Sequence, residues 1–273
     1  MNYRHIYHAG NRADLIKHLT LAHLLLRLCE KDTPFAVLDT HAGAGNYDLS
    51  SVEAQKTKEA AEGAAAFFAL PPHPALAPLQ EILKKLNGAT LHRYPGSPVI
   101  ARQYLRENDR LILVEKHPEE FKKLRTLFAA DKPVLLHERD AWEAVNALLP
   151  LPEKRLLVFI DPPYEQPDEM DKALQAILKA YSRVSNALYA LWYPITDAIA
   201  VARMKEKLAN SDIKKMLSVD VEHAPQNNLK GCGMILINPP WQIENVLKDA
   251  CEALRPLYSE GASIDIEWLK LAD

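Results

Sequence analysis

The sequence predicts an α/β fold built on one Rossmann-like parallel sheet, and two observations support this. Short apolar runs end where polar, Gly or Pro residues begin, at 35–39, 111–115, 133–137, 156–161 and 187–194. The runs are continuous rather than alternating, which is typical of parallel strands covered on both faces. Helical spacing of apolar residues separates several of them, at 118–130, 140–149 and 168–184. Alternating strands and helices indicate a parallel sheet with right-handed crossovers.

The C-terminal third has a different pattern. Residues 214–223 and 263–270 alternate between apolar and polar, whereas 232–238 form a continuous apolar run. We expect these segments to form the far edge of the same sheet, including an antiparallel hairpin.

Residues 48–89 interrupt the alternation of strands and helices. They are rich in Ala, Glu and Lys, and the prolines in 70–74 divide them into two predicted helices. We therefore expect a Rossmann-like domain formed by 1–47 and 90–273, with a helical subdomain inserted at 48–89. The residues leave two roles open for the insertion, which are contact with a substrate and a purely structural cover for the sheet.

Composition limits the class of protein. The chain has 273 residues, which is long enough to bury a sizeable core. Its net charge of −3 argues against a non-specific nucleic-acid binder. An enzyme with a local basic patch remains compatible with these values. The three cysteines are scattered and the N-terminal histidines have no matching carboxylate or thiolate, so we expect no metal site. No secretory h-region or run of roughly 18 apolar residues occurs, so we expect a cytoplasmic protein without a membrane partner.

The run DPPY at 161–164 directly follows an apolar run and is the most informative motif. Ligands of open α/β sheets bind at the carboxyl ends of the strands. The two prolines stiffen the turn and lack N–H groups, so its carbonyl groups point outward. An ionised Asp161 can only accept hydrogen bonds. The alternative interpretation is an ordinary surface turn after a strand.

These groups suit the exocyclic amine of adenine, whose lone pair is delocalised into the ring. Acceptors on both N–H bonds localise that lone pair, and Asp161 and the Pro162 carbonyl can supply them. Pro163 stiffens the turn, and Tyr164 offers a flat face to an unstacked base, worth about 1–3 kcal/mol. Chemistry at a base edge requires a base outside its stack. The motif therefore predicts a catalytic site for methyl transfer at 161–164.

The run DTHAGAG at 39–45 follows the first apolar run. Gly43 and Gly45 permit close approach of the backbone to a cofactor. The dinucleotide pattern G-x-G-x-x-G fails because Asp48 occupies its last position, which weighs against a nicotinamide oxidoreductase. The run is similar to the methyltransferase loop that lies against the methionine part of S-adenosylmethionine. His41 has two interpretations, a cofactor contact and a histidine that closes the loop.

Three other polar residues stand at predicted strand or helix ends. Glu115 ends the second strand run, where an acceptor for ribose hydroxyls belongs, or it simply precedes the next helix. Asp140 is suited to accept from a cofactor adenine amine, to cap the following helix, or to do both. Ser97 before Pro98 resembles an N-cap with proline at N1, whose N–H groups bind a carboxylate or serve only as a cap.

The segment 3–18 is dense in His, aromatic and basic residues. Basic groups interleaved with Tyr3 and Tyr7 suit contacts with phosphates and bases. A solvated surface is the alternative.

With these motifs in view, the chain resembles the bacterial 23S rRNA adenine-N6 methyltransferase family known as RlmJ. The resemblance covers essentially the whole length. It includes the runs at 3–5, 8–11, 17–18, 39–45, 94–101, 191–194 and 238–241. It implies a Rossmann-like methyltransferase with a small helical insertion after the first strand.

The resemblance also implies S-adenosylmethionine as the cofactor, S-adenosylhomocysteine as its product and 23S rRNA as the partner. It implies a cofactor-binding set of His18, His41, Gly43, Gly45, Ser97, Glu115, Asp140, Ala141 and Asp161. It implies a substrate-binding set of Tyr3, Arg4, His5, Lys17 and Tyr164. Relatives can have Gly where Ala141 stands, which is a minor departure if only the backbone N–H is used.

Two alternatives to an rRNA methyltransferase are considered. A DNA adenine-N6 methyltransferase would use the same chemistry, but such enzymes usually need a further recognition domain and the sequence contains no such block. A nucleic-acid-binding protein linked to use of external DNA would not need to bind S-adenosylmethionine.

Overall fold

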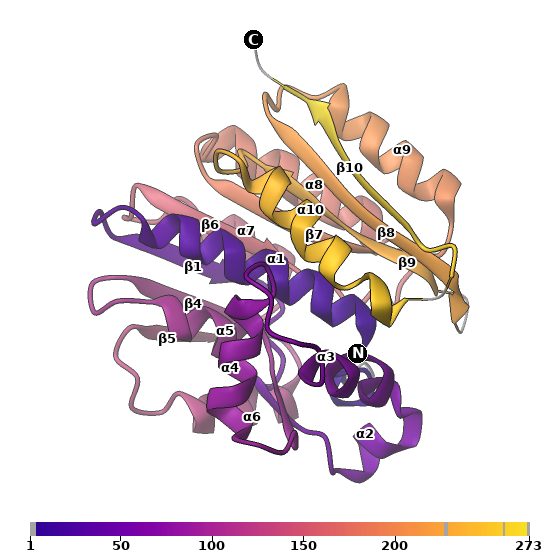
Figure 1. The fold of residues 1–273 in the computed structure, drawn as a ribbon. Coiled ribbons are helices and arrows are strands. Elements are labelled where there is room, and N and C mark those ends of the chain that lie inside the picture. Colours follow the sequence, from indigo (N-terminus) through magenta and orange to yellow (C-terminus); the bar gives the residue numbers. More distant parts are fainter. Residues whose placement is uncertain (1–3, 227–228, 259, 272–273) are drawn as a thin grey trace.

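The computed structural model describes residues 4–226, 229–258 and 260–271. Within these residues one sheet contains eight strands in the order β10-β8-β9-β7-β6-β1-β4-β5 (Figure 1). The strands of this sheet are β1 Phe35–Asp39, β4 Arg110–Glu115, β5 Val134–Glu138, β6 Arg155–Ile160, β7 Leu188–Ile195, β8 Met216–Gln226, β9 Leu229–Ile237 and β10 Ser263–Lys270.

The topology confirms the predicted fold class. Strands β5, β4, β1, β6 and β7 pair in parallel, and their order is the 3-2-1-4-5 order of a doubly wound Rossmann-like sheet. Strand β9 pairs antiparallel with β7 and with β8, and β10 pairs antiparallel with β8. The expected antiparallel hairpin at the far edge is therefore present.

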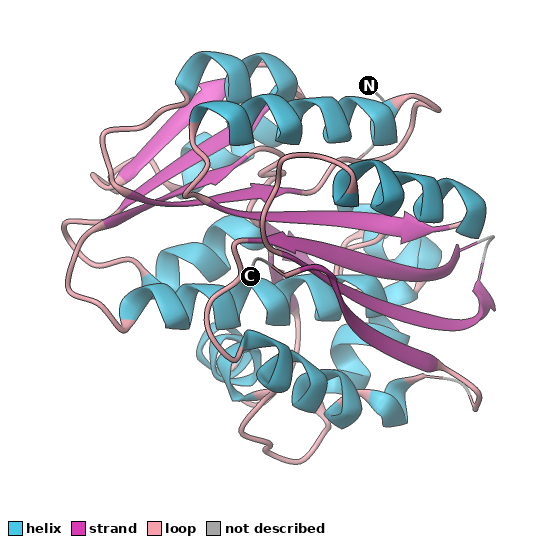
Figure 2. Ribbon diagram, turned by 90° about the horizontal axis from the view of Figure 1, so that it is seen from above, coloured by secondary structure: helices cyan, strands magenta, loops and turns pink. Residues whose placement is uncertain are grey.

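Helices cover both faces of the sheet, as Figure 2 shows. One core contains side chains of Phe35 and Val37, and the other contains Ala36 and Leu38. Because both faces are buried, successive residues of β1 are all apolar until Asp39. The helices on the first face are α1 Arg12–Cys29, α4 Ala77–Asn87, α5 Ser97–Tyr104, α6 Pro118–Leu127 and α10 Ile243–Ala253. Those on the second face are α7 Ala141–Leu148, α8 Glu169–Arg183 and α9 Ala198–Ala209.

Strand β5 corrects one expectation. The run at 133–137 was predicted to be covered on both faces, but no residue of β5 is fully buried and Leu135 is 42% exposed. The reason is position, because β5 is the outermost strand and pairs only with β4. Continuous apolar character therefore did not distinguish this edge strand from a central one.

Residues 48–89 form helices between two short strands. Strand β2 Asn46–Asp48 pairs antiparallel with β3 Arg93–Pro95, a ribbon that the sequence pattern did not indicate. Between them lie α2 Val52–Thr57, the π-helical turn η2 Ala61–Ala65, α3 Ala66–Phe68 and α4. Phe67 and Leu79 are fully buried in the same core as α1. The segment thus packs on the first face of the main sheet.

Helix α1 positions three of the polar groups discussed below, Asp14, Lys17 and His18. It packs against α5 and α10, and Figure 1 shows α1 and α10 side by side. The hydroxyl of Tyr258, close after α10, donates to the carbonyl of Arg12 at 3.4 Å. The segment after α10 is therefore joined to the helix that precedes the first strand of the sheet. No helix of the described residues is long and apolar enough to cross a bilayer.

Candidate active site

A cavity of about 520 Å³ opens at the carboxyl ends of the parallel strands. Its walls come from α1, the loop after β1, the ends of β4 and β6, and β7. The volume lies in the range typical of small-molecule sites, and the position is the usual one in open α/β sheets. The predicted site residues that line it are His5, Lys17, His18, His41, Gly43, Ser97, Glu115, Asp140, Ala141, Asp161, Pro162, Pro163 and Tyr164.

Three predicted residues fall outside this set. Tyr3 lies outside the described residues. Arg4 does not line the cavity and instead forms ion pairs with Glu120 at 3.4 Å and Glu53 at 3.7 Å. Gly45 does not line it either, and a Cβ there would lie 2.9 Å from Leu127. Its φ of +78° and this close packing explain the glycine without a ligand contact.

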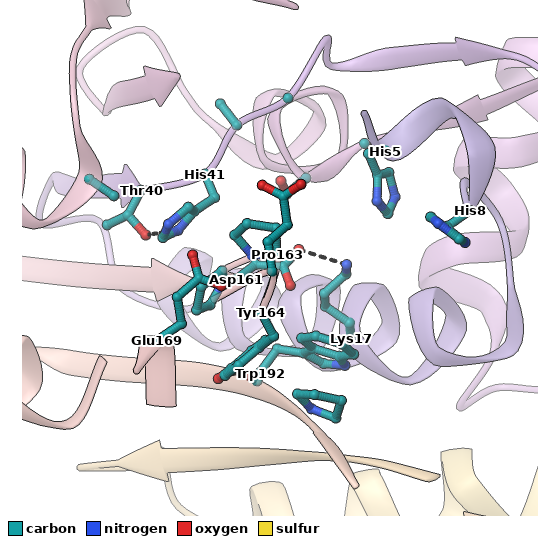
Figure 3. A pocket seen from close by; sticks show the side chains of 18 of the residues that line it. His5, His8, Lys17, Thr40, His41, Asp161, Pro163, Tyr164, Glu169 and Trp192 are labelled. Atoms are coloured by element: carbon teal, nitrogen blue, oxygen red, sulfur yellow. Dashed lines mark hydrogen bonds and ion pairs between the residues drawn. The ribbon is translucent and has the colours of Figure 1, made fainter. Parts of the chain in front are cut away.

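Strand β6 delivers the DPPY run to the cavity (Figure 3). Tyr164 has a left-handed φ of +52°. Its hydroxyl donates to the carbonyl of Trp192 at 2.8 Å, and the two rings meet edge to face at 5.7 Å. The Tyr164 ring is therefore held in one orientation beside Asp161.

The Asp161 carboxylate is paired with a lysine of α1. Lys17 Nζ lies 2.6 Å from Asp161 Oδ2 and 2.8 Å from Asp14 Oδ1. The same ammonium lies 5.2 Å from the centre of the Trp192 ring. Burial raises the pKa of Asp161 even though the Lys17 charge opposes this shift. The cavity thus contains a carboxyl group whose pKa lies above that of a surface aspartate.

Asp14 joins this pair to the N-terminal segment. Its Oδ2 accepts from Gly10 N at 2.8 Å and lies 2.9 Å from His5 Nε2. Burial alone would raise the pKa of Asp14, but His5 and Lys17 outweigh burial and hold that pKa well below its usual range. Asp14 is therefore ionised while it is buried.

Glu115 is hydrogen-bonded to the loop after β1, and both line the cavity. The Glu115 carboxylate accepts from Gly43 N at 2.8 Å and from His117 N at 2.6 Å. A carboxylate has about four lone-pair sites, so hydrogen-bonding capacity remains for a ligand. Gly43 has φ +59°, and a Cβ there would lie 2.2 Å from the Tyr47 hydroxyl. Only glycine suits this point of the loop.

Asp140 caps helix α7, as one interpretation of the sequence expected. Its Oδ1 accepts from Trp142 N at 2.9 Å and from Glu143 N at 3.3 Å, while Oδ2 pairs with Lys116 at 3.0 Å. These partners outweigh burial and lower the pKa of Asp140. Ala141 follows it at the start of α7 and also lines the cavity.

The expected N-cap role of Ser97 is wrong by one position. Helix α5 begins at Ser97, and its N-cap is Gly96, which makes no side-chain cap. Gly96 N donates to the carbonyl of Gly45 at 2.9 Å, and this bond keeps Gly96 extended at ψ 172°. The Ser97 hydroxyl instead lowers the pKa of Asp39, which burial nevertheless raises to about 7.

Two of the histidines that line the cavity, His18 and His41, are neutral. Burial lowers the pKa of both His18 and His41 to about 3. His18 Nδ1 lies 2.9 Å from the Tyr94 hydroxyl, and His41 Nδ1 lies 2.8 Å from Thr40 Oγ1. His41 thus has a partner within its own loop and also faces the cavity. Both rings keep hydrogen-bonding capacity without adding positive charge.

Sequence reasoning missed two polar or aromatic groups at this site. Asp14 shares a helical face with Lys17 and His18 at spacings of three and four, which is a usable signal. Trp192 belongs to the LWYP run at 191–194, but nothing in that run indicates that its ring faces Lys17. The described residues contain no group of His, Cys, Asp and Glu arranged to hold a metal ion.

The residues present fit S-adenosylmethionine. Glu115 and Asp140 supply acceptors at two neighbouring strand ends for ribose hydroxyls and an adenine amine. Gly43 lines the cavity, and its positive φ turns the loop there, so a ligand can lie against the loop backbone. The carboxylate of Asp161 lies in the same cavity and suits a positively charged sulfur.

Comparisons with known proteins agree with this geometry. The model of the family described as Ribosomal RNA large subunit methyltransferase D, RlmJ, matches residues 32–270. A Haemophilus influenzae protein named Ribosomal RNA large subunit methyltransferase J is 39% identical, over 98% of this chain and 99% of its own. The protein of the same name from Escherichia coli K12 is also 39% identical, over 91% of each chain.

A solved structure extends the similarity to three dimensions. The crystal structure of protein LPL1258 from Legionella pneumophila has a TM-score of 0.87 and 39% identity, covering 95% of this chain and 98% of that one. The family match, the full-length identity and the cavity lead to the same assignment. This chain belongs to the RlmJ family of ribosomal RNA large subunit methyltransferases.

Proposed function

We propose that this protein transfers a methyl group from S-adenosylmethionine to the N6 amine of an adenine in 23S rRNA. One observation carries the proposal. The DPPY turn at 161–164 and the acidic residue Glu115 with its glycine loop line the same cavity. An acceptor for an amine and a place for a nucleoside cofactor therefore lie side by side. The names of the relatives support an RNA of the large subunit as the substrate.

The cofactor would occupy the half of the cavity formed by β1, β4 and α7. In this proposal Glu115 accepts from the ribose hydroxyls and Asp140 accepts from the cofactor adenine, with Ala141 N–H nearby. The group around the methionine part consists of His18, His41, Gly43, Gly45, Ser97 and Asp161. Gly45 acts there through the shape of the loop, because its own contacts are with α6.

The target adenine would occupy the half formed by the DPPY turn. S-adenosylmethionine supplies an electrophilic methyl group on a positively charged sulfur. Asp161 and the Pro162 carbonyl accept the two N–H bonds of the amine and so localise the N6 lone pair, which forms the new N–C bond. The S–C bonding pair stays with sulfur, giving S-adenosylhomocysteine, and the amine loses one proton toward Asp161. Positioning and charge stabilisation supply the catalysis.

The remaining substrate contacts come from two elements. Tyr164 would stack on the unstacked base, since its ring is fixed by the Trp192 carbonyl. Lys17 and His5 would lie beside that base, with Arg4 and Tyr3 closer to the RNA backbone. We also propose that residues 48–89 are an inserted subdomain that supports the N-terminal segment, because Glu59 accepts a hydrogen bond from Asn11 at 3.1 Å.

Mass mapping of methylated adenines in 23S rRNA from cells with and without this protein tests the assignment. We expect one N6-methyladenine to be lost with the protein and restored by the wild-type chain. Purified protein should methylate a 23S rRNA transcript and not a DNA hairpin of the same sequence. Asp161→Ala should abolish transfer, whereas Asp265→Ala on the exposed face of β10 should not. Unchanged 23S rRNA, or an active Asp161→Ala protein, would refute the proposal.

A further inference from the structure

Asp14 is a buried acid for which the proposed chemistry has no direct use. It lies in the first turn of α1 and is only 1% exposed. Burying a charge is costly unless the charge is paired and hydrogen-bonded. Asp14 satisfies this condition through Gly10 N, His5 and Lys17. An acid held at this cost beside a reaction centre calls for an explanation.

The position of Lys17 supplies that explanation. Its ammonium lies between two carboxylates, 2.8 Å from Asp14 and 2.6 Å from Asp161. The ammonium is also almost fully buried, with 5% of its side chain exposed, so water does little to screen it. With Asp161 as its only partner, Lys17 would neutralise the acid that must accept from the target amine. With two partners, the three groups together keep one negative charge.

Resting on the proposed function, we infer that Asp14 is a positioning residue that shares the Lys17 ammonium and thereby keeps Asp161 an effective acceptor for the target amine. Asp14 acts through Lys17 and does not touch the reacting atoms. The Trp192 ring, 5.2 Å from the ammonium, restrains Lys17 from a third side. Lys17 can therefore fix the orientation of the Asp161 carboxylate without neutralising the charge of that carboxylate.

The charged groups around Asp161 predict in which direction the pH–rate profile should shift when Asp14 is replaced. Lys17 and His5 lower the pKa of Asp161, whereas Asp14 raises it, and Asp39 faces Asp161 from β1. Removing the Asp14 charge should therefore lower the pKa of Asp161. The acidic limb of the pH–rate profile should then move to lower pH. A general loss of structure would reduce the rate at every pH and leave the limb in place.

The decisive experiment compares Asp14→Asn with Asp171→Asn, using S-adenosylmethionine and a 23S rRNA transcript. Asp171 is a matched control because it also stands in the first turn of its helix and pairs with a lysine, Lys207, at 3.0 Å, but is exposed. We expect Asp14→Asn to lower kcat roughly tenfold to a hundredfold, the value of one charge-assisted hydrogen bond. The KM for S-adenosylmethionine should stay the same, and the acidic limb should shift down. Asp171→Asn should change none of these.

Two further variants keep the inference testable if Asp14→Asn folds poorly, which thermal unfolding would reveal. Asp14→Glu retains the charge, so its acidic limb should stay at the wild-type pH. In a Lys17→Met background, Asp14→Asn should change kcat much less than in the wild type, because no ammonium remains to be shared. An unshifted limb in Asp14→Asn, a shifted limb in Asp14→Glu, or equal effects in both backgrounds would overturn the inference. Lack of methylation by the wild-type protein would instead refute the proposed function.

Discussion

The amino ends and the carboxyl ends of the parallel strands each have an aspartate beside a cation. Asp109 at the amino ends is buried, Asp161 at the carboxyl ends is partly exposed, and the two have different hydrogen-bonding neighbours. At the amino-end edge, Asp109 is 2% exposed and accepts from Phe35 N at 3.0 Å and from Arg106 N and Nε at 2.9 and 2.8 Å. These donors outweigh burial and lower the pKa of Asp109. At the carboxyl-end edge, burial outweighs Lys17 and raises the pKa of Asp161.

The difference separates an acid that stabilises the fold from one that is available to a ligand. The Asp109 oxygens are occupied by donors from its own loop and from β1. The Asp161 cation is shared with a second acid, and the turn around Asp161 contains two prolines that cannot donate. Perturbed carboxyls in a cleft are candidates for function, whereas paired ones often serve structure.

The largest expected effect comes from replacing each of the two aspartates by Asn and comparing the two variants. Asp161→Asn should lower the rate of methyl transfer by about a thousandfold, as for loss of one charge-stabilising group. It should not lower the free energy of unfolding, because the folded protein disfavours the ionised acid. Asp109→Asn should lower that free energy by about 2 kcal/mol and keep the rate, since it leaves buried donors with a weaker acceptor.

Methylation kinetics and denaturant unfolding of both variants provide the measurement. A large rate loss in Asp109→Asn at full folding, or a large stability loss in Asp161→Asn, would remove the distinction between the two edges.

A second test uses the pH dependence of stability. Asp39 titrates near its ordinary value of 3.8 when unfolded and at about 7 when folded. Between these values unfolding releases a proton, so the Asp39 contribution to the free energy of unfolding falls as pH rises. The free energy of unfolding of the wild type, measured relative to that of Asp39→Asn, should fall across this pH window by about 2–4 kcal/mol.

The contribution of Asp109 to the free energy of unfolding should change with pH in the opposite direction. Its folded pKa is lowered, so its contribution is full above the ordinary pKa and is lost as pH falls through the folded value. Urea unfolding of wild type, Asp39→Asn and Asp109→Asn at a series of pH values distinguishes the two. Parallel curves for all three proteins would contradict the pKa assignments at both edges.

The smallest expected effect concerns the support of the site edge by residues 48–89. Gly63 packs on the N-terminal loop so closely that a Cβ would lie 2.0 Å from the carbonyl of Gly10. Gly63→Ala should therefore lower the free energy of unfolding by about 1–3 kcal/mol, as overpacking does. Ala65→Ser adds one atom on the exposed side of the same turn and serves as the control. Equal stabilities would show that this contact can relax.

The sequence predicted most of the sheet and the half of the site that lies directly at strand ends. Glu115 and the DPPY run were found because a parallel strand fixes where its next residue lies. The change in apolar pattern predicted that the C-terminal strands form the far edge of the sheet with an antiparallel hairpin, and the structure confirms this.

The parts that the sequence did not reveal depend on contacts between distant segments. The Lys17–Asp161 pair joins a helix before the first strand to the end of β6, and no local pattern encodes that meeting. The β2–β3 ribbon has strands of three residues, which are too short to show a period. The exposure of β5 depends on the absence of a further strand beside it in the described sheet, not on its own residues.

Helix α1 is held by the end of the chain, and this has a consequence for synthesis. Asp14 and Lys17 leave the ribosome long before α10 and Tyr258, yet α10 and Tyr258 pack on their helix. Closing so long a loop comes late in folding. A nascent chain that is released before α10 would contain every proposed catalytic residue and still lack the helix that packs against α1. The enzyme should therefore gain activity only when α10 and Tyr258 have been translated.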